Sequence, residues 1–194
     1  INGIVRGSFS SNLFLNNVKH YLNIKELNRL ALLETFDGIQ FFYGPVGIDE
    51  CNSIDSKIAY INLATRILNS LNIKPKISIL SGGRLGDVGR DSIVDKTINI
   101  ADQVVEYIRK NNKDLDINHD EILIENAIKN KSNIIIAPDG ISGNLIYRTL
   151  VHLGGGKAYG AIYMGIKKPI IDTSRVGKSS EIFGALVLAL ALSK

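Results

Sequence analysis

The 194-residue sequence contains no tryptophan and only one cysteine, Cys51. A single cysteine cannot form an internal disulfide, which favours a reducing, cytoplasmic location. Cys51 lies in the polar stretch DECNS, and we interpret it as a structural or incidental thiol rather than a nucleophile. Aromatic residues make up only 7% of the chain, and the lysines and arginines are scattered. Nucleic-acid binding requires a basic stripe with aromatic residues, so we expect no nucleic-acid partner.

The motifs of common metal and nucleotide sites are also missing. The three histidines do not fall in ligand spacing, and no HExxH, CxxC or DxDxDG occurs, so no metal site is predicted. No GxGxxG follows a strand, and no GxSxG elbow is present. The apolar run IFGALVLALAL is far shorter than the about 20 residues of a membrane span. We therefore expect a buried helix there and no membrane partner.

The composition indicates a globular protein with a substantial core. Hydrophobic residues make up 45% and charged residues 22%, which suits one large domain or two small lobes around a cleft. The net charge of +4 is spread along the chain, so a small anionic ligand is the expected partner. No signal peptide is visible, and the chain opens with Ile1 rather than Met, so we expect the natural protein to begin earlier.

Apolar periodicity alternates between helix and strand along most of the chain. Asp37-Gly38 between two apolar runs predicts an antiparallel hairpin. The segment NNKDLDINHD (111–120) is predicted to be a polar surface loop. Helices are predicted at 11–22, 53–72, 92–110, 119–130 and 142–153 and at the C-terminal end; strands are predicted in INGIVRGS, RLALLET, IQFFYG, KISILS, NIIIAPD, AYGAIYMG and PIIDT.

This alternation predicts a three-layer α/β/α fold with a mainly parallel sheet. In such sheets ligands bind beyond the carboxyl ends of the strands. Three loops would lie there, after KISILS, after NIIIAPD and after PIIDT, and they are the loops richest in Gly, Ser, Asp and Arg.

The first loop runs from Ser81 to Arg90 and contains four glycines. Glycines allow close approach of the backbone, whose N–H groups can cradle an anion. Arginine side chains can add forked donors to a phosphate. We therefore predict anion binding here, and the alternative is a flexible solvent loop that needs glycine only for its turns. The candidate ligand-binding residues are Ser81, Gly82, Gly83, Arg84 and Arg90.

The second loop contains Asp139, Ser142, Gly143 and Asn144, between a strand and a helix. Ser142 and Asn144 could donate hydrogen bonds near a helix N-terminus, which already favours anions. Alternatively, Asp139 or Ser142 caps the helix, and the two roles are compatible.

The third loop, DTSRVGKSSE (172–181), contains Gly177-Lys178-Ser179, the end of a phosphate-binding P-loop motif. The full motif needs a glycine five positions before the Gly-Lys pair, where this chain has Asp172. We reject the P-loop interpretation on that ground and keep Lys178 as a candidate ligand-binding residue. Glu181 falls in the first turn of the last helix, where a carboxylate either pairs with the helix dipole or acts as a base.

In order along the chain, several segments resemble the phosphate acetyl/butyryltransferase superfamily. They are INGIVRGSFSSN (1–12), KPKISILSGG (74–83), APDGISGN (137–144), GAIYMG (160–165) and KPIIDTSR (168–175). The segments GPVGIDEC and GGRLGDVGRD resemble most the MtxX branch, a methanogenesis marker family that carries a methyltransferase label. The resemblance implies a phosphotransacetylase-like fold of the isocitrate/isopropylmalate dehydrogenase type. It also implies two lobes around a cleft, approximately 1–35 plus 155–194 and 36–154.

The resemblance also implies catalytic residues. In phosphotransacetylases a Ser-Arg pair and an Asp seven residues after the Ser assist attack of a thiol on an acyl phosphate. Ser174 and Arg175 match this pair, while Glu181 takes the Asp position and is one methylene longer. The glycine that follows Ser-Arg in the family is Val176 here, and the family's short phosphate loop becomes GGRLGDVGR.

The expected function is a metal-independent transfer of an acyl or related group between a phosphate-bearing donor and a thiol or similar acceptor. Arg84, Arg90 and Arg175 would bind the anion, Ser174 would hydrogen-bond the reacting group, and Glu181 would be the general base. The ligand would be CoA-like or phosphate-containing. The alternatives are a methyltransferase or methyltransferase accessory in methanogenesis, and a non-catalytic anion-binding protein. The family's habit of dimerising and the apolar last helix predict a homodimer.

Overall fold

A single eight-stranded mixed sheet forms the centre of the computed structural model, which describes residues 2–174 and 177–193. The strand order is β1-β8-β7-β2-β3-β6-β4-β5. Both predicted lobes contribute strands to this one sheet. The strands are β1 (Ile4–Arg6), β2 (Arg29–Glu34), β3 (Gln40–Gly44), β4 (Lys76–Ile79), β5 (Asp116–His119), β6 (Ile134–Ile136), β7 (Lys157–Tyr163) and β8 (Ile170–Asp172).

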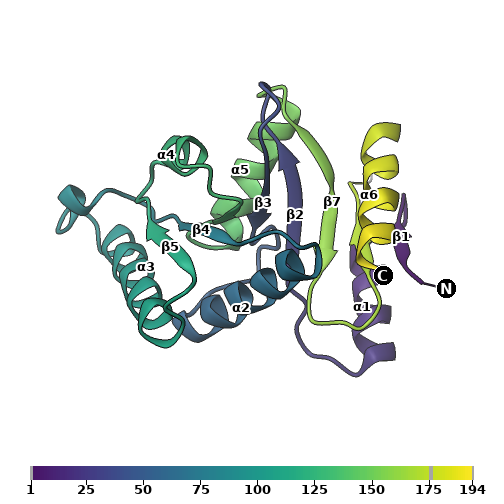
Figure 1. The fold of residues 1–194 in the computed structure, drawn as a ribbon, viewed down its shortest axis with the longest axis horizontal. Coiled ribbons are helices and arrows are strands. Elements are labelled where there is room, and N and C mark those ends of the chain that lie inside the picture. The colour runs from purple at the N-terminus through teal and green to yellow at the C-terminus, as the bar shows by residue number, and fades with distance from the viewer. Residues whose placement is uncertain (1, 175–176, 194) are drawn as a thin grey trace.

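Helices cover both faces of the sheet, so the predicted three-layer α/β/α fold is confirmed (Figure 1). One face, called the α2 face below, packs its isoleucines against α2, α3 and α6. The opposite α5 face packs against α1, α4 and α5. The helices are α1 (Ser11–Leu22), α2 (Ile54–Ser70), α3 (Ser92–Asn111), α4 (Ile124–Lys129), α5 (Gly140–His152) and α6 (Ser179–Leu192), with a 3₁₀ turn η1 at Leu85–Asp87.

The predicted hairpin is present, since β2 and β3 are antiparallel and joined across Asp37-Gly38, where Gly38 has a φ of 90°. The prediction of a polar loop at 111–120 was wrong, because β5 lies inside that segment and pairs with β4 at the edge of the sheet. Only Ile117 of this strand is buried, so the segment carries almost no apolar signal. The helix predicted at 119–130 is shorter, and spans only α4.

Strand direction decides which loops meet. The strands β3, β6, β4 and β5 are parallel to one another, whereas β8 is antiparallel to β7, β7 to β2 and β2 to β3. The strand β8 therefore points opposite to β4 and β6. Its carboxyl end stops beside Ala161, in the middle of β7. The loop after β8 thus opens over the α5 face rather than at the edge where the loop after β4 lies.

A β-bulge lies beside this strand end. Between Ala31 and Leu33 of β2, the partner strand β7 advances from Ala161 to Ala158 and so contains one extra residue. Gly160 sits in the bulge with a φ of 95°. A bulge changes which face the following side chains point to, and here both Ala158 and Ala161 pack on the α5 face. The result is a floor of small side chains under the loop that follows β8.

Close backbone contact fixes the start of α5 against the loop that follows β3. A Cβ at Gly140 would overlap the carbonyl oxygen of Gly47, and a Cβ at Gly143 would overlap that of Pro45.

No helix in the described ranges is long and apolar enough to cross a membrane.

The Gly143→Ala variant should therefore lose about 1–3 kcal/mol of unfolding free energy, the range for overpacking a close contact. The matched control is Gly86→Ala in η1, where an added Cβ meets no atom within 4 Å and the expected change is within about 0.5 kcal/mol. Urea denaturation followed by circular dichroism measures both. Equal stability of the two variants would contradict the argument.

Candidate functional site

A polar cleft of about 520 Å³ lies on the α5 face between α5 and the loop after β8. We call it the arginine cleft. Its charged and hydrogen-bonding residues come from six separate segments, which the fold brings together. They are Arg6, Ser11, Arg29, Asn144, Tyr147, Arg148, Asp172, Thr173, Ser174 and Glu181. Gly160 and Ala161 of the bulged strand β7 also line it, so the floor leaves room for a ligand.

Asp172 forms the wall of the cleft together with two arginines. The Arg6 guanidinium donates from Nε to Asp172 Oδ1, and Arg29 Nη1 lies 3.8 Å from Asp172 Oδ2. Arg29 also donates from Nε to Glu50 Oε1 at 2.8 Å. Arg6, Asp172 and Glu50 are buried, and buried charges are stable only when they are paired. Asp172 is thus a structural partner of arginines, which agrees with the rejection of the P-loop interpretation.

Arg6 also holds the loop after β8 in place. Its guanidinium donates to the carbonyl oxygens of Phe9 and Thr173, and the Thr173 hydroxyl donates back to the Arg6 carbonyl oxygen. These bonds join the ends of β1 and β8, which pair in parallel. Ser174 follows directly, so its position in the cleft depends on this clamp.

Glu181 reaches the same loop from the first turn of α6. Its Oε1 accepts a hydrogen bond from the Ser174 backbone N–H at 2.8 Å, and its side chain is buried. Burial raises the pKa of this carboxyl, the Ser174 N–H lowers it, the Asp172 charge raises it and Arg6 lowers it, with a net rise. A carboxyl with a raised pKa beside a cleft is suited to general acid–base chemistry.

Gly177 makes room for this carboxylate. A Cβ at Gly177 would overlap Glu181 Oε2, and the Gly177 N–H donates to the Ser174 carbonyl oxygen at 2.9 Å. Lys178 is the exposed N-cap residue of α6. The predicted catalytic residue Arg175 lies outside the described residues.

The second predicted loop forms mainly a helix cap. Asp139 is the N-cap residue of α5, and its Oδ1 accepts from the backbone N–H of Ser142 at 2.8 Å and from the Ser142 hydroxyl at 3.0 Å. Gly143 serves the backbone contact with Pro45. Of this loop only Asn144 lines the arginine cleft, while its amide donates to the Val46 carbonyl oxygen at 2.8 Å.

The first predicted loop is remote from the arginine cleft. Four strands separate β4 from β8 in the sheet, which corresponds to about 24 Å at the usual strand spacing. Figure 1 shows β4 and α3 at one end of the molecule and α6 and β1 at the other. The expected anion pocket between the Ser81–Arg90 loop and the Ser174–Arg175 turn does not form, because β8 runs opposite to β4.

Several backbone N–H groups of this loop already donate hydrogen bonds within the protein. The Gly82 N–H donates to the Thr97 hydroxyl at 2.8 Å, that of Arg84 to Asp87 at 2.9 Å and that of Gly89 to Asp95 at 2.9 Å. The Arg90 guanidinium pairs with Asp87. These donors of the loop are already hydrogen-bonded within the protein and are not free to bind an anion. The geometry of the loop therefore does not support the predicted role of Gly82, Gly83, Arg84 and Arg90.

Ser81 belongs to a hydrogen-bonded chain of a different kind. Its hydroxyl lies 2.9 Å from Nε2 of His119, whose Nδ1 lies 2.7 Å from Oδ1 of Asp102. The order resembles that of a hydrolase triad. However, Ser81 is only 1% exposed and its hydroxyl also donates to the Gly83 carbonyl oxygen at 2.8 Å. No substrate can reach the Ser81 hydroxyl in this structure. The hydrogen bonds of Ser81, His119 and Asp102 instead join β4, β5 and α3.

Three arginines of the cleft were missed by the sequence reasoning. Arg6 is the last residue of β1, Arg29 is the first residue of β2, and Arg148 lies within α5. The available signal was weak, namely a basic residue at the end of an otherwise apolar strand, as in INGIVRG.

No group of three or more potential metal ligands gathers within the described ranges.

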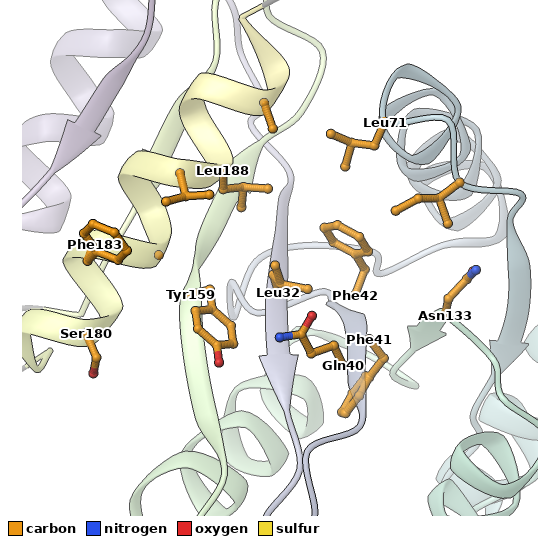
Figure 2. A pocket seen from close by; sticks show the side chains of 14 residues that line it. Leu32, Gln40, Phe41, Phe42, Leu71, Asn133, Tyr159, Ser180, Phe183 and Leu188 are labelled. Atoms are coloured by element: carbon orange, nitrogen blue, oxygen red, sulfur yellow. The ribbon is translucent and has the colours of Figure 1, made fainter.

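A second hollow, of about 740 Å³, lies on the opposite face of the sheet. Figure 2 shows Phe183 and Leu188 of α6 on one side of it, Leu71 beyond α2 on the other and Phe42 at its floor. Its polar side chains are Gln40, Asn133, Tyr159 and Ser180, and of these Tyr159 and Gln40 both hydrogen-bond the Glu34 carboxylate. Among the described residues no charged side chain lines this apolar groove, whereas several charged groups line the arginine cleft.

Comparison with known proteins identifies the family of the chain. The family model described as Phosphate acetyl/butaryl transferase matches residues 18–190. The chain belongs to this family. Its match covers α5, β7, β8 and nearly all of α6, the elements that carry most of the arginine cleft.

Individual relatives carry two kinds of name. A Methanosarcina mazei protein named "Putative methyltransferase mtx subunit X" is 46% identical over the whole chain, which covers 67% of that protein. A phosphate acetyltransferase of Borreliella burgdorferi is 26% identical over 80% of the chain and 47% of its own length. The chain thus spans about two thirds or less of these relatives. The expected resemblance to the superfamily and to its MtxX branch is confirmed.

The fold is shared with solved members of the family. A branched-chain phosphotransacylase from Enterococcus faecalis superposes with a TM-score of 0.78 at 18% identity, over all of this chain and 74% of its own. This likeness shows the fold alone.

The raised pKa of Glu181 predicts a pH-dependent difference in stability. The folded state holds the Glu181 proton more tightly than the unfolded chain does, so stability is lost as the pH rises through the folded-state pKa. The Glu181→Gln variant has no such loss, so its melting temperature should gain on the wild type between pH 5 and pH 8. Thermal unfolding at both pH values measures this, with exposed Glu106→Gln on α3 as the control. A wild-type advantage that grows with pH would contradict the assignment.

Proposed function

We propose that the chain carries a phosphotransacetylase-like transferase site, which moves an acyl group between a phosphate-bearing donor and a thiol acceptor. The observation that carries the proposal is the Glu181 carboxylate. It is buried, has a raised pKa and is held by the Ser174 N–H beside three arginines. Membership of the phosphate acetyl/butaryl transferase family supports the same chemistry.

Each group of the cleft has a role in this reaction. Arg148 is exposed at the cleft and is placed to bind the phosphoryl group of the donor. Ser174 hydrogen-bonds the reacting group, with Arg175 next to it in sequence. Glu181 accepts the thiol proton, the sulfur then bonds to the carbonyl carbon, and the carbon–oxygen bond to phosphate breaks, so phosphate leaves.

Removing the base should lower the rate of the chemical step. For acetyl phosphate and CoA as substrates, Glu181→Gln should lower kcat by about 10²–10⁴, the range for general-base catalysis. Glu106→Gln is the matched control and should keep wild-type kcat. Release of phosphate and formation of the thioester are measured together. Equal activity of the wild type and Glu181→Gln would remove Glu181 from the mechanism.

The second candidate is a methyltransferase, or a methyltransferase accessory in methanogenesis, and it is favoured by the name of the M. mazei relative. Methyl transfer from S-adenosylmethionine, with no turnover of acetyl phosphate, would select it. Binding of acetyl phosphate or CoA without turnover of any donor would select the third candidate, a non-catalytic anion-binding protein. The single buried Cys51 supports a cytoplasmic location for any of them.

We also propose that the protein is a homodimer that buries the outer face of α6. Five large apolar side chains are exposed there: Ile182, Phe183, Leu186, Val187 and Leu190. A continuous apolar face of this kind marks an interaction surface. Sedimentation velocity should give twice the monomer mass for the wild type and the monomer mass for Phe183→Glu/Leu190→Glu. A monomeric wild type at all concentrations would contradict the proposal.

A further inference from the structure

The loop after β3, residues 45–50, borders the arginine cleft through Val46. Two other residues of this loop, Gly47 and Glu50, do not line the cleft but contact Arg29, which does. The proposed function as stated gives this loop no role.

The two arginines that approach Asp172 differ in how many of their donors the protein uses. All three guanidinium nitrogens of Arg6 donate to Asp172 or to backbone carbonyl oxygens. Within the described ranges the Arg29 guanidinium donates only from Nε, to Glu50 Oε1. Its Nη1 lies 3.8 Å from Asp172 Oδ2, which is longer than a hydrogen bond. The Arg29 side chain is 16% exposed, against 4% for Arg6, so Arg29 still has donors to offer a ligand.

Glu50 holds Arg29 by its side chain and by its backbone. Its Oε1 accepts from Arg29 Nε at 2.8 Å, and its Oε2 accepts from the Arg29 backbone N–H at 3.2 Å. The Tyr60 hydroxyl donates to the Arg29 carbonyl oxygen at 2.5 Å. Because the guanidinium is planar and rigid, an acceptor that fixes Nε also sets the direction of the two Nη groups.

Gly47 provides the space for this ion pair. A Cβ at Gly47 would overlap both Arg29 Nη2 and Glu50 Oε1. Gly47 is not among the glycines with a positive φ, so its backbone conformation does not require glycine. The Gly47 carbonyl oxygen lies in close contact with Gly140 at the start of α5, which leaves the loop little freedom to move. An added methyl group would therefore displace the ends of the two charged side chains.

We propose that Gly47 and Glu50 are positioning residues, which hold the Arg29 guanidinium so that its Nη groups face the phosphoryl group of the donor. This inference rests on the proposed function. Neither residue touches the ligand, and both act through Arg29. Arg148 then binds the phosphoryl group from the exposed side of the cleft, and Arg29 binds it from the more buried side.

The Gly47→Ala variant tests this arrangement without removing any of the interacting groups. Its methyl group should displace the Arg29 guanidinium and weaken the binding of inorganic phosphate, measured by calorimetric titration, by on the order of tenfold. KM for acetyl phosphate should rise by the same factor, while KM for CoA stays within about twofold. The matched control is Gly86→Ala in η1, where an added Cβ meets no atom, and it should keep wild-type values.

Two substitutions at Glu50 separate positioning from general support of the fold. Glu50→Gln keeps an oxygen acceptor for Arg29 Nε and should bind phosphate within about twofold of the wild type. Glu50→Ala removes that acceptor and should weaken phosphate binding by on the order of tenfold. Equal weakening in both variants would overturn the positioning role of Glu50. Thermal unfolding shows whether each variant folds, and if Glu50→Ala does not, the comparison of Gly47→Ala with Gly86→Ala decides.

The failure of this inference and the failure of the proposed function give different results. Unchanged phosphate binding in Gly47→Ala, an equal rise in both of its KM values, or a wild type that binds no phosphate would overturn the inference. A wild type that binds phosphate but transfers no acyl group would remove the proposed function. In that case weaker phosphate binding by Gly47→Ala than by Gly86→Ala still supports the positioning of Arg29.

Discussion

The ion pairs of Asp172 with Arg6 and Arg29 are the interaction on which the site depends. They join the carboxyl ends of β1 and β8 to the start of β2, across a sequence separation of 166 residues for the Arg6 pair. All three side chains are largely withdrawn from water, and removing one partner would leave a buried charge unpaired. The strands involved are only three residues long at β1 and β8, so few ladder hydrogen bonds could hold their ends without these pairs.

The residues of these ion pairs also affect the pKa of the neighbouring Glu181 carboxyl. Asp172 raises and Arg6 lowers the pKa of Glu181, while burial contributes the largest rise. A carboxylate so close to an uncompensated Asp172 would be pushed to the protonated form, which cannot act as a base. The Arg6 guanidinium, which is paired with Asp172, opposes that effect. The Arg6–Asp172 pair, which fixes the geometry of the cleft, therefore also acts on the pKa of Glu181.

Local patterns were enough to predict most of the fold. The hairpin, four helices close to their observed bounds, the presence of the last helix and the apolar strands follow from periodicity and turn chemistry. The contact between Glu181 and Ser174 spans only seven residues, so the motif itself predicted their proximity. The direction of β8 could not be read from its sequence, because short buried strands look the same in either direction. That single unknown placed the Ser81–Arg90 loop at the wrong site. For the same reason the sequence did not predict that Arg6 and Arg29 line the cleft, since their partners are distant in sequence.

Two departures from the family pattern meet in one contact of this structure. The family has Asp seven residues after the serine and Gly two residues after it, whereas this chain has Glu181 and, one position later, Gly177. The longer carboxylate reaches back to the Ser174 N–H and places its second oxygen where a Cβ at residue 177 would lie. A side chain there would force Glu181 out of its position, since backbone and carboxylate are both held by hydrogen bonds. Glu181 and Gly177 therefore fit together in this chain, and the fit keeps a carboxylate at the serine turn.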